Sequence, residues 1–297
     1  MTTRHPHPHL GPHHFRSLLF IKASASPERI RSIAPGVTLI LDLEDGVSVD
    51  RKSWQRQQLR RFFRLGLFRD RTVLLRINGP DQPEEMRRDL EACIHPDLDG
   101  ILFPMVQSAE EVEQLAEQLG RKEAELSLPN GRIAVIPLIE RPGAILALEE
   151  IARSSERIVG LVFGHVDYCV EMHAEMTEEC YGEAQGKLLQ VARALQLAAV
   201  STLYLQLDDA RGFREHGARM KRRGFDGCLA LTPSQAEAAL GVFSPTLEEL
   251  EHARRVVAAV EEQGNIAVLN GRMIGPPMLK KARRILAQHA LQHREVA

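Results

Sequence analysis

The chain has 297 residues and a formal net charge of −2 at pH 7, so it can bury a sizeable core but lacks the broad basic surface that nucleic-acid binding requires. No apolar run reaches the roughly 18 residues of a membrane-spanning helix, and the histidines and prolines near the start do not form a signal peptide. The four cysteines form no CxxC pair, which predicts reduced thiols and a cytoplasmic protein without a membrane partner.

The first fourteen residues, MTTRHPHPHLGPHH, contain five histidines interspersed with prolines. Such a composition cannot pack a core, so residues 1–14 are expected to form a disordered arm. A metal-binding arm is the alternative, but the spacing of the histidines defines no coordination geometry.

From residue 15 to residue 242, short apolar runs alternate with segments of helical length. One of these segments begins with a capping box, Ser108 followed by Glu111. Eight such runs, without a glycine-rich dinucleotide turn after the first, predict an α/β fold of the (β/α)8 TIM-barrel type rather than a doubly wound sheet. The predicted strands are 17–21, 37–43, 72–77, 100–103, 133–139, 158–163, 202–205 and 227–231.

Residues 243–297 continue beyond the last predicted strand and its closing helix. Amphipathic patterns predict helices at 246–263 and 277–288, joined by a segment whose glycines and prolines mark turns. A complete barrel does not need these helices. We therefore interpret the C-terminal helical extension as a cap or an oligomer contact.

Charged side chains follow four of the predicted strands at their carboxyl ends. Active sites of TIM-barrel enzymes lie at this end of the strands, so the set predicts a functional site. An arginine opposite several carboxylates can also be a purely structural ion pair. The residues are Asp42, Glu44 and Asp45 at the carboxyl end of the second strand, Arg76 in the third, Glu140 after the fifth and Asp167 after the sixth.

The residue types predict the chemistry of this site. Glu140 and Asp167 would follow neighbouring strands and could hold one cation, and oxygen ligands without cysteine suit Mg²⁺ or Mn²⁺. The guanidinium of Arg76 matches a substrate carboxylate at two points. Together they predict a small oxo or hydroxy acid as substrate, with carbon–carbon bond cleavage or formation next to its carbonyl.

Seven short motifs occur in a fixed order along the chain: RSLLF at Arg16, DLED at Asp42, RING at Arg76, PLIE ending at Glu140, FGHVD at 163–167, FSPT at Phe243 and GRMI at Gly271. In this order and spacing they resemble the HpcH/HpaI aldolase and citrate lyase beta-subunit family, from residue 15 to about residue 288. The resemblance implies a TIM barrel with a C-terminal extension, assembled as homotrimers or larger.

The resemblance also implies roles for individual residues. Glu140 and Asp167 would bind Mg²⁺, and Arg76 and Arg16 would contact the substrate. Glu44 and Asp45 would act with Arg76 in catalysis, behind the metal ligands or through metal-bound water. The implied substrates are 3-hydroxy-acyl thioesters of coenzyme A or acyl carrier protein, of the citryl, malyl or citramalyl type, or aldols derived from pyruvate.

Four positions depart from the family pattern. Lys22 stands in the turn after the first strand, Met105 replaces a lysine and Thr232 replaces a histidine. Gly275 replaces an aspartate that, in relatives that cleave thioesters, a neighbouring subunit supplies as an acid or base. The candidates for a replacement proton-transfer group are His165, Asp208 and Asp209.

Three functions therefore stay open from the sequence. The leading one is a Mg²⁺-dependent carbon–carbon lyase of the citrate lyase beta-like group, acting on a 3-hydroxy-acyl thioester or a related hydroxy-oxo acid. The second is a class II pyruvate-type aldolase that uses no thioester. The third is a catalytically reduced relative that keeps its metal site for sensing or assembly.

Overall fold

A computed structural model of the protein describes residues 7, 10–22 and 24–294. Its contacts divide the chain into two compact units between Leu240 and Gly241, close to the predicted boundary at residue 242. Residues 1–6 and 8–9 of the predicted arm lie outside the described residues.

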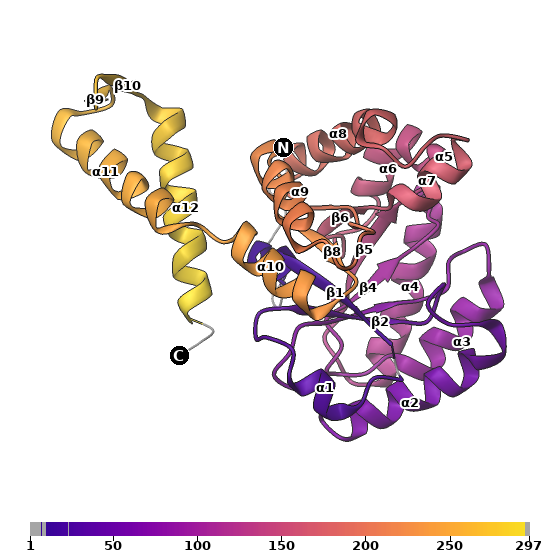
Figure 1. Cartoon of the computed structure of the whole chain (residues 1–297). Coiled ribbons are helices and arrows are strands. Elements are labelled where there is room, and N and C mark those ends of the chain that lie inside the picture. Colours follow the sequence, from indigo (N-terminus) through magenta and orange to yellow (C-terminus); the bar gives the residue numbers. More distant parts are fainter. Residues whose placement is uncertain (1–6, 8–9, 23, 295–297) are drawn as a thin grey trace. The chain divides into compact units, whose positions relative to one another are not determined.

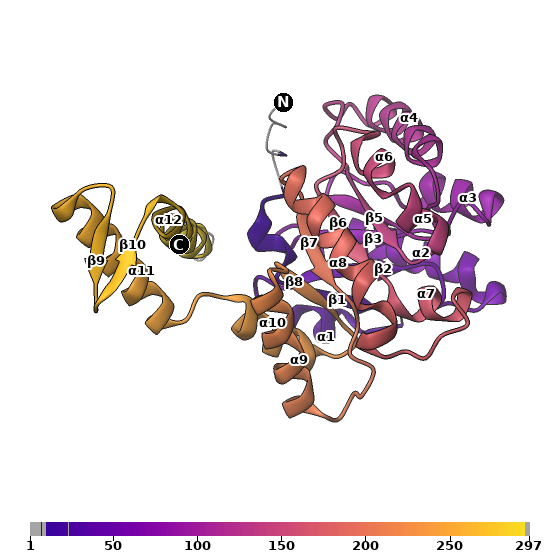
Figure 2. The same ribbon diagram turned by 90° about the horizontal axis from the view of Figure 1, so that it is seen from above.

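The first unit is a closed parallel barrel, and Figure 1 shows its strands at the centre of the unit. Among the described residues, eight strands pair in chain order, and β1 closes the barrel by pairing Leu18 with Leu229 of β8. Figure 2 shows the helices arranged around these strands. The predicted TIM barrel is confirmed. The strands are β1 (Ser17–Ile21), β2 (Thr38–Asp42), β3 (Val73–Arg76), β4 (Gly100–Phe103), β5 (Ala134–Ile139), β6 (Gly160–Phe163), β7 (Ala198–Ser201) and β8 (Gly227–Ala230).

The position of the seventh strand is the one strand prediction that is wrong. It was predicted at 202–205, but β7 pairs Ala198 with Gly160 of β6 and ends at Ser201. Packing explains these small residues, because a Cβ added at Gly160 would lie 3.1 Å from the Ala198 Cβ and 3.2 Å from Cε1 of Phe15. Phe15 fills the barrel at this level and leaves room only for small side chains on β6 and β7.

Leu10 and the short 3-10 helix η1 (Pro12–Phe15) close the amino-terminal end of the barrel. Leu10 and Phe15 are both buried, in one core cluster with Leu18, Ile40 and other inward residues of the strands. Burying each side chain contributes roughly 1.5–3 kcal/mol to folding. The expectation of disorder is therefore wrong for residues 10–14, because these two apolar side chains anchor the segment.

Helix α4 (Ala109–Glu125) begins at the capping box that the sequence predicts. At the start of α4, the Ser108 hydroxyl accepts from Glu111 N at 3.3 Å and the Glu111 carboxylate accepts from Ser108 N at 3.2 Å. This confirms the capping box, which satisfies two donors that the helix itself cannot pair. The helices are α1 (Pro27–Arg31), η2 (Val49–Arg51), α2 (Lys52–Arg64), α3 (Pro83–Cys93), α4 (Ala109–Glu125), α5 (Pro142–Leu146), α6 (Leu148–Arg153), α7 (His165–Glu171), α8 (Glu178–Ala194), α9 (Ala210–Arg223) and α10 (Pro233–Phe243).

The second unit contains two long helices and a β-hairpin that was not predicted. Helices α11 (Leu247–Gln263) and α12 (Pro276–Arg294) pack around a small core that includes Val256 and Ile274, and strands β9 (Ala267–Leu269) and β10 (Arg272–Ile274) lie between them in the chain. Asn270 and Gly271 form the hairpin turn with φ angles of 52° and 72°. Asn-Gly is the preferred pair for such a turn, so the signal was present in the sequence.

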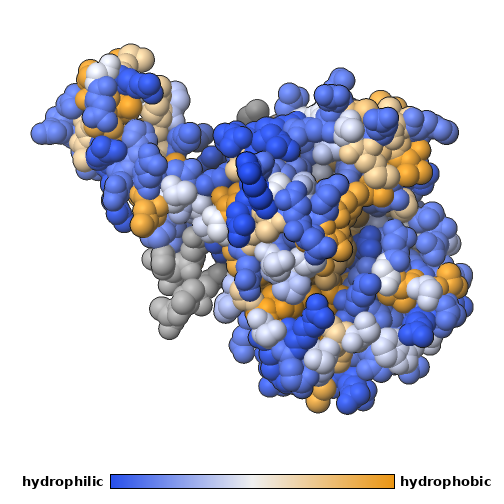
Figure 3. Space-filling view, in the orientation of Figure 1, coloured by the Kyte–Doolittle hydropathy of each residue, from blue (hydrophilic) through white to orange (hydrophobic). Residues whose placement is uncertain are grey.

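The surface of the protein is mainly hydrophilic on the face that Figure 3 shows, and hydrophobic residues gather there over α5 and α7. Leu146, at the end of α5, is 83% exposed, and Val170 of α7 is also exposed. In the part of the chain that the structure describes, no helix is long and apolar enough to cross a bilayer.

Glu123→Ala is expected to lower the free energy of unfolding by about 3 kcal/mol. The buried Glu123 carboxylate accepts from both terminal nitrogens of Arg157 at 2.7 Å and from the backbone N–H groups of Gly131 and Ile133. The substitution leaves a buried arginine unpaired. Urea unfolding measures the loss, and Glu125→Ala, which removes an exposed carboxylate on the same helix, is the control. Equal stability of the two variants would show that the buried pair contributes nothing.

Candidate active site

The carboxyl ends of β2, β3, β5 and β6 bring the predicted charged residues to one face of the barrel. Asp42 and Arg76 are the last residues of β2 and β3, and the parallel register places them side by side. Glu140 directly follows β5, and Asp167 lies in the first turn of α7, which begins just after β6. Because all eight strands run in the same direction, these ends share the face on which TIM-barrel enzymes carry their active sites.

Arg76 is held by Asp42 through a two-point ion pair. Arg76 Nε donates to Asp42 Oδ1 at 2.8 Å, and Arg76 Nη2 donates to Asp42 Oδ2 at 2.7 Å. The guanidinium carbon lies 4.7 Å from the centre of the Phe20 ring, a cation–π contact. Asp42 is itself fixed because it accepts the backbone N–H groups of Glu44 and Gly46. One edge of the predicted substrate fork is therefore occupied, and a ligand would meet Arg76 on its Nη1 side, which Glu44 also contacts.

Glu44 lies beside this Nη1 side. Its Oε2 is 2.5 Å from Arg76 Nη1, although the two groups do not align for a hydrogen bond. Glu44 is 3% exposed, and burial raises its pKa to about 8, while Arg76 opposes the shift and the neighbouring carboxylates of Asp45, Asp42 and Asp167 add to it. Asp45 itself is exposed at the rim. Glu44 can therefore exchange a proton near neutral pH.

Glu140 is fixed in position from two sides. It is 2% exposed, and its Oε1 accepts from Met105 N at 2.8 Å. Met105 has a φ of 56°, a left-handed conformation that costs a residue other than glycine roughly 1–2 kcal/mol. On the other side, Gly164 makes room, because a Cβ there would lie 2.7 Å from Glu140 Oε2. The left-handed backbone at Met105 and the absence of a side chain at Gly164 together fix the position of the Glu140 carboxylate.

The carboxylates of the site oppose one another's ionisation. Burial raises the pKa of Glu140 well above its usual value, Glu44 and Asp167 add to the shift, and the Met105 N–H and Arg76 oppose it. Burial also raises the pKa of Asp167, and Asp45 adds to that shift. A cation bound between these groups would relieve the repulsion and favour the charged forms.

Glu140 and Asp167 fit a hard divalent cation that needs few protein ligands. Mg²⁺ keeps several waters and is usually bound through one or two carboxylates together with substrate oxygens. Among the described residues, no group of three or more His, Cys, Asp or Glu side chains is arranged to hold a metal ion. A site here would thus complete its coordination with water and substrate, and its oxygen donors favour Mg²⁺ or Mn²⁺.

Arg16 lies at the opposite end of the barrel from Arg76. It directly precedes β1, it is buried, and its Nε donates to the carbonyl oxygen of His13 at 2.9 Å. Strand β1 runs from this residue toward the site and places it a full strand length away. The prediction that Arg16 binds substrate is therefore wrong.

Two of the three candidates for a replacement proton-transfer group, His165 and Asp209, are held in structural contacts. His165 is buried, which lowers its pKa to about 4, and its Nδ1 hydrogen-bonds to the Thr202 hydroxyl. The Asp209 carboxylate accepts from Gly212 N at 2.8 Å and so caps α9. Asp208 is exposed beside it.

Thr232 stands where the family pattern has a histidine. Its hydroxyl accepts from Gln235 N at the start of α10.

Gly164→Ala is expected to displace the Glu140 carboxylate and to weaken the binding of Mn²⁺ about tenfold or more. The new methyl group would collide with Glu140 Cβ and Oε2, both 2.7 Å away. Calorimetric titration with Mn²⁺ measures the change. Gly182→Ala is the matched control, because its Cβ would meet only Glu178 Cγ at 3.8 Å. An unchanged affinity in a folded Gly164→Ala protein would exclude Glu140 as a ligand.

Comparisons with known proteins show which sequences this chain resembles. The sequence matches the family model of HpcH/HpaI aldolase/citrate lyase over residues 16–233. It is similar to the citrate lyase subunit beta of Escherichia coli, with 32% identity over 285 residues that cover 93% of each chain. It is equally similar to the (3S)-malyl-CoA thioesterase of Cereibacter sphaeroides, with 32% identity over 93% of this chain and 95% of the relative.

Solved structures show the same likeness. CitE from Mycobacterium tuberculosis, in complex with magnesium, acetoacetate and coenzyme A, aligns with a TM-score of 0.75 and 27% identity over 91% of this chain and 96% of that one. A citrate lyase from Burkholderia xenovorans aligns with a TM-score of 0.82 over 94% of this chain and 92% of that one. Its identity is 17%, so this second likeness shows the fold alone.

Proposed function

Because the chain belongs to the HpcH/HpaI aldolase/citrate lyase family of carbon–carbon lyases and aldolases, we propose that it is a Mg²⁺-dependent lyase. Its substrate would be a 3-hydroxy-acyl thioester of the citryl, malyl or citramalyl type, or a related hydroxy-oxo acid. The observation that carries the proposal is the convergence of Glu140 and Asp167 with Arg76 at the carboxyl ends of the strands. The solved relative that holds magnesium, an oxo acid and coenzyme A supports it.

Each residue has a defined task in this proposal. Glu140 and Asp167 would hold the cation, which would stabilise the negative charge on the substrate oxygen that loses its proton. The Nη1 side of Arg76 binds a substrate oxygen, and Asp42 and Phe20 keep the guanidinium in place. Glu44, whose pKa is about 8, takes the proton of the substrate hydroxyl, whose oxygen becomes the carbonyl of the oxo-acid product. The electron pair of the broken carbon–carbon bond passes to the carbonyl of the departing fragment as its enolate, which then takes a proton from water.

A class II pyruvate-type aldolase that uses no thioester is the second candidate, and Gly275 favours it. This position, between β10 and α12, carries no proton-transfer group where the family resemblance implies an aspartate. Space does not explain the glycine, because an added Cβ would meet only Pro277 Cδ at 3.8 Å.

The two candidates differ in the substrates that they cleave. Turnover is measured with Mg²⁺ and citryl-, malyl- and citramalyl-coenzyme A, and in parallel with free 4-hydroxy-2-oxo acids. The leading proposal expects cleavage of at least one thioester. Cleavage of free acids alone would overturn it in favour of the aldolase, and Gly275→Asp is then expected to introduce thioester cleavage. Mg²⁺ binding without turnover of any of these substrates would point instead to a sensing or assembly role.

A further inference from the structure

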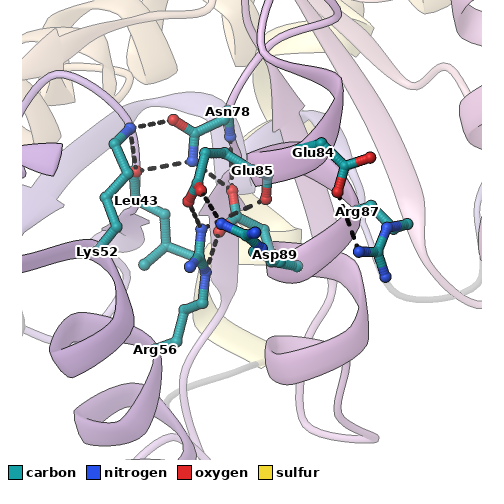
Figure 4. A network of polar contacts seen from close by, with 9 residues as sticks. Leu43, Lys52, Arg56, Asn78, Glu84, Glu85, Arg87 and Asp89 are labelled. Atoms are coloured by element: carbon teal, nitrogen blue, oxygen red, sulfur yellow. Dashed lines mark hydrogen bonds and ion pairs between the residues drawn. The ribbon is translucent and has the colours of Figure 1, made fainter.

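A network of buried polar side chains lies behind the site and joins α2 and α3 to the ends of β2 and β3 (Figure 4). Lys52, the first residue of α2, is 4% exposed. Its Nζ donates to the Leu43 carbonyl oxygen at 3.2 Å and to the Asn78 side-chain oxygen. Asn78 Nδ2 donates to the same Leu43 carbonyl at 3.0 Å. The three groups form a closed triangle, which we call the Lys52 clamp.

The Lys52 clamp joins the two chain segments that hold the guanidinium of the site. Leu43 lies between Asp42 and Glu44, and Asn78 follows Arg76 by two residues. The clamp therefore ties the loop that carries the carboxylates to the strand end that carries the arginine. Its hydrogen bonds involve no residue of β5, β6 or α7, among the described residues, and so do not reach Glu140 or Asp167.

Asn78 is fixed from behind by a second set of contacts. Oδ2 of the buried Asp89 accepts from Asn78 N at 2.8 Å and from Asn78 Nδ2 at 2.6 Å, and its Oδ1 accepts from Arg56 Nε at 2.7 Å. Arg56 is also paired with Glu85. Helix α3 thereby orients the Asn78 amide so that its oxygen faces Lys52, as Figure 4 shows.

Stability alone does not explain a lysine at this position. In the described part of the chain, the Lys52 ammonium bonds to two neutral oxygens and to no carboxylate. Burying a cation in this way is costly, and an apolar side chain of similar length would avoid the cost. The positive charge of Lys52 is however favoured by its surroundings, because the loop to which it is hydrogen-bonded carries the acidic residues Asp42, Glu44 and Asp45.

We propose that Lys52 and Asn78 are positioning residues of the active site, which hold Glu44 in register with Arg76 without contacting substrate. The inference rests on the proposed function, because it assigns the clamp to the oxo-acid half of that site. Without the clamp, the Leu43 N–H still donates to the Arg76 carbonyl oxygen and Asp42 still pairs with Arg76, but the residues after Leu43 lose their tie to Asn78, and Glu44 loses its alignment with the Nη1 side of Arg76. The cation ligands keep their positions, because the clamp does not hold them.

Lys52→Met tests this proposal, because it keeps the length of the side chain and removes its donors. Affinity for pyruvate, titrated by calorimetry into Mn²⁺-loaded protein, is expected to fall about tenfold or more, while the affinity for Mn²⁺ itself stays within about threefold. Asn78→Ala is expected to cost about as much. The double variant should bind pyruvate no more weakly than the weaker single variant, because both changes break the same triangle.

Two further measurements separate positioning from a general loss of stability. Arg157→Met breaks the buried pair with Glu123 near the amino-terminal end of the barrel and is expected to leave pyruvate affinity unchanged at a temperature where the protein is folded. Hydrogen exchange of the metal-free protein is expected to quicken at 42–46 in Lys52→Met. If Lys52→Met does not fold, Lys52→Gln, which retains a donor for one of the two oxygens, replaces it in both measurements.

The outcomes distinguish this inference from the function on which it rests. Wild-type pyruvate affinity in Lys52→Met, fully additive losses in the double variant, or unchanged exchange at 42–46 would each overturn the clamp. A wild-type protein that binds Mn²⁺ but no oxo acid would overturn the proposed function instead, and with it the assignment of the clamp to that site.

Discussion

Glu140→Gln is expected to abolish binding of the divalent cation and to reduce turnover about a thousandfold, while making the metal-free protein more stable. The amide keeps an oxygen that can accept the Met105 N–H, so the loop after β4 is not disturbed. It loses the negative charge that a cation requires. Titration with Mn²⁺ and the assay of turnover measure the two losses, and full activity in this variant would exclude Glu140 from the site.

The gain in stability follows from the raised pKa of Glu140. Because the folded protein holds the proton more tightly than the unfolded chain, this carboxyl contributes stability at low pH that is lost as the pH rises through its folded-state pKa. Glu140→Gln has no carboxyl to ionise, so its stability does not fall as the pH rises through this range. In EDTA, the melting temperature of Glu140→Gln should exceed that of the wild type by more at pH 8 than at pH 5. Glu125→Gln, at an exposed position of α4, should show no such difference.

Arg76→Lys is expected to lower kcat/KM about a hundredfold and the free energy of unfolding by about 2–4 kcal/mol. A lysine ammonium cannot make two parallel hydrogen bonds to Asp42 and at the same time lie against Glu44. The substitution leaves buried carboxylates poorly paired and removes the donor that faces the substrate. Steady-state kinetics and urea unfolding measure the two effects.

The matched control for Arg76→Lys is Arg87→Lys on α3, whose ion pairs with Glu84 and Glu91 are exposed. Pairs of this kind contribute at most about 1 kcal/mol, and this one lies outside the site. Arg87→Lys should therefore change neither activity nor stability appreciably. If Arg76→Lys behaved in the same way, the guanidinium of Arg76 would be needed neither for stability nor for turnover, and the assignment of substrate binding to it would fail.

Much of the barrel could be predicted because buried parallel strands are short continuous apolar runs, as in β5 and β6. The predictions that failed did so because of how side chains pack inside the barrel. Ala198 of β7 is small because Phe15 and Gly160 of β6 pack beside it inside the barrel, and a run of small residues is not a strong signal for a strand. Residues 10–14 were predicted to be disordered because single apolar residues among histidines and prolines give no periodic pattern. Leu10 and Phe15 become buried only because the amino-terminal end of the barrel offers them a surface to pack against.

The grouping of the candidate site residues could be predicted where it depends on position along a strand. Asp42, Arg76 and Glu140 mark strand ends, and strand ends share a face in any parallel barrel. Arg16 was misassigned because its motif lies at the beginning of a strand rather than at its end. The left-handed backbone of Met105 and the buried contacts of Lys52 were not predictable, because they depend on which loops meet in space.

The central claim is that Glu140 and Asp167 hold a divalent cation opposite Arg76 and that an oxo acid binds between them. A crystal structure of the protein grown with Mg²⁺ and pyruvate tests it most directly. We expect a cation within about 2.0–2.2 Å of one carboxylate oxygen from each of the two residues, with pyruvate on the Nη1 side of Arg76. A cation bound elsewhere, or pyruvate bound away from the carboxyl ends of the strands, would contradict this account.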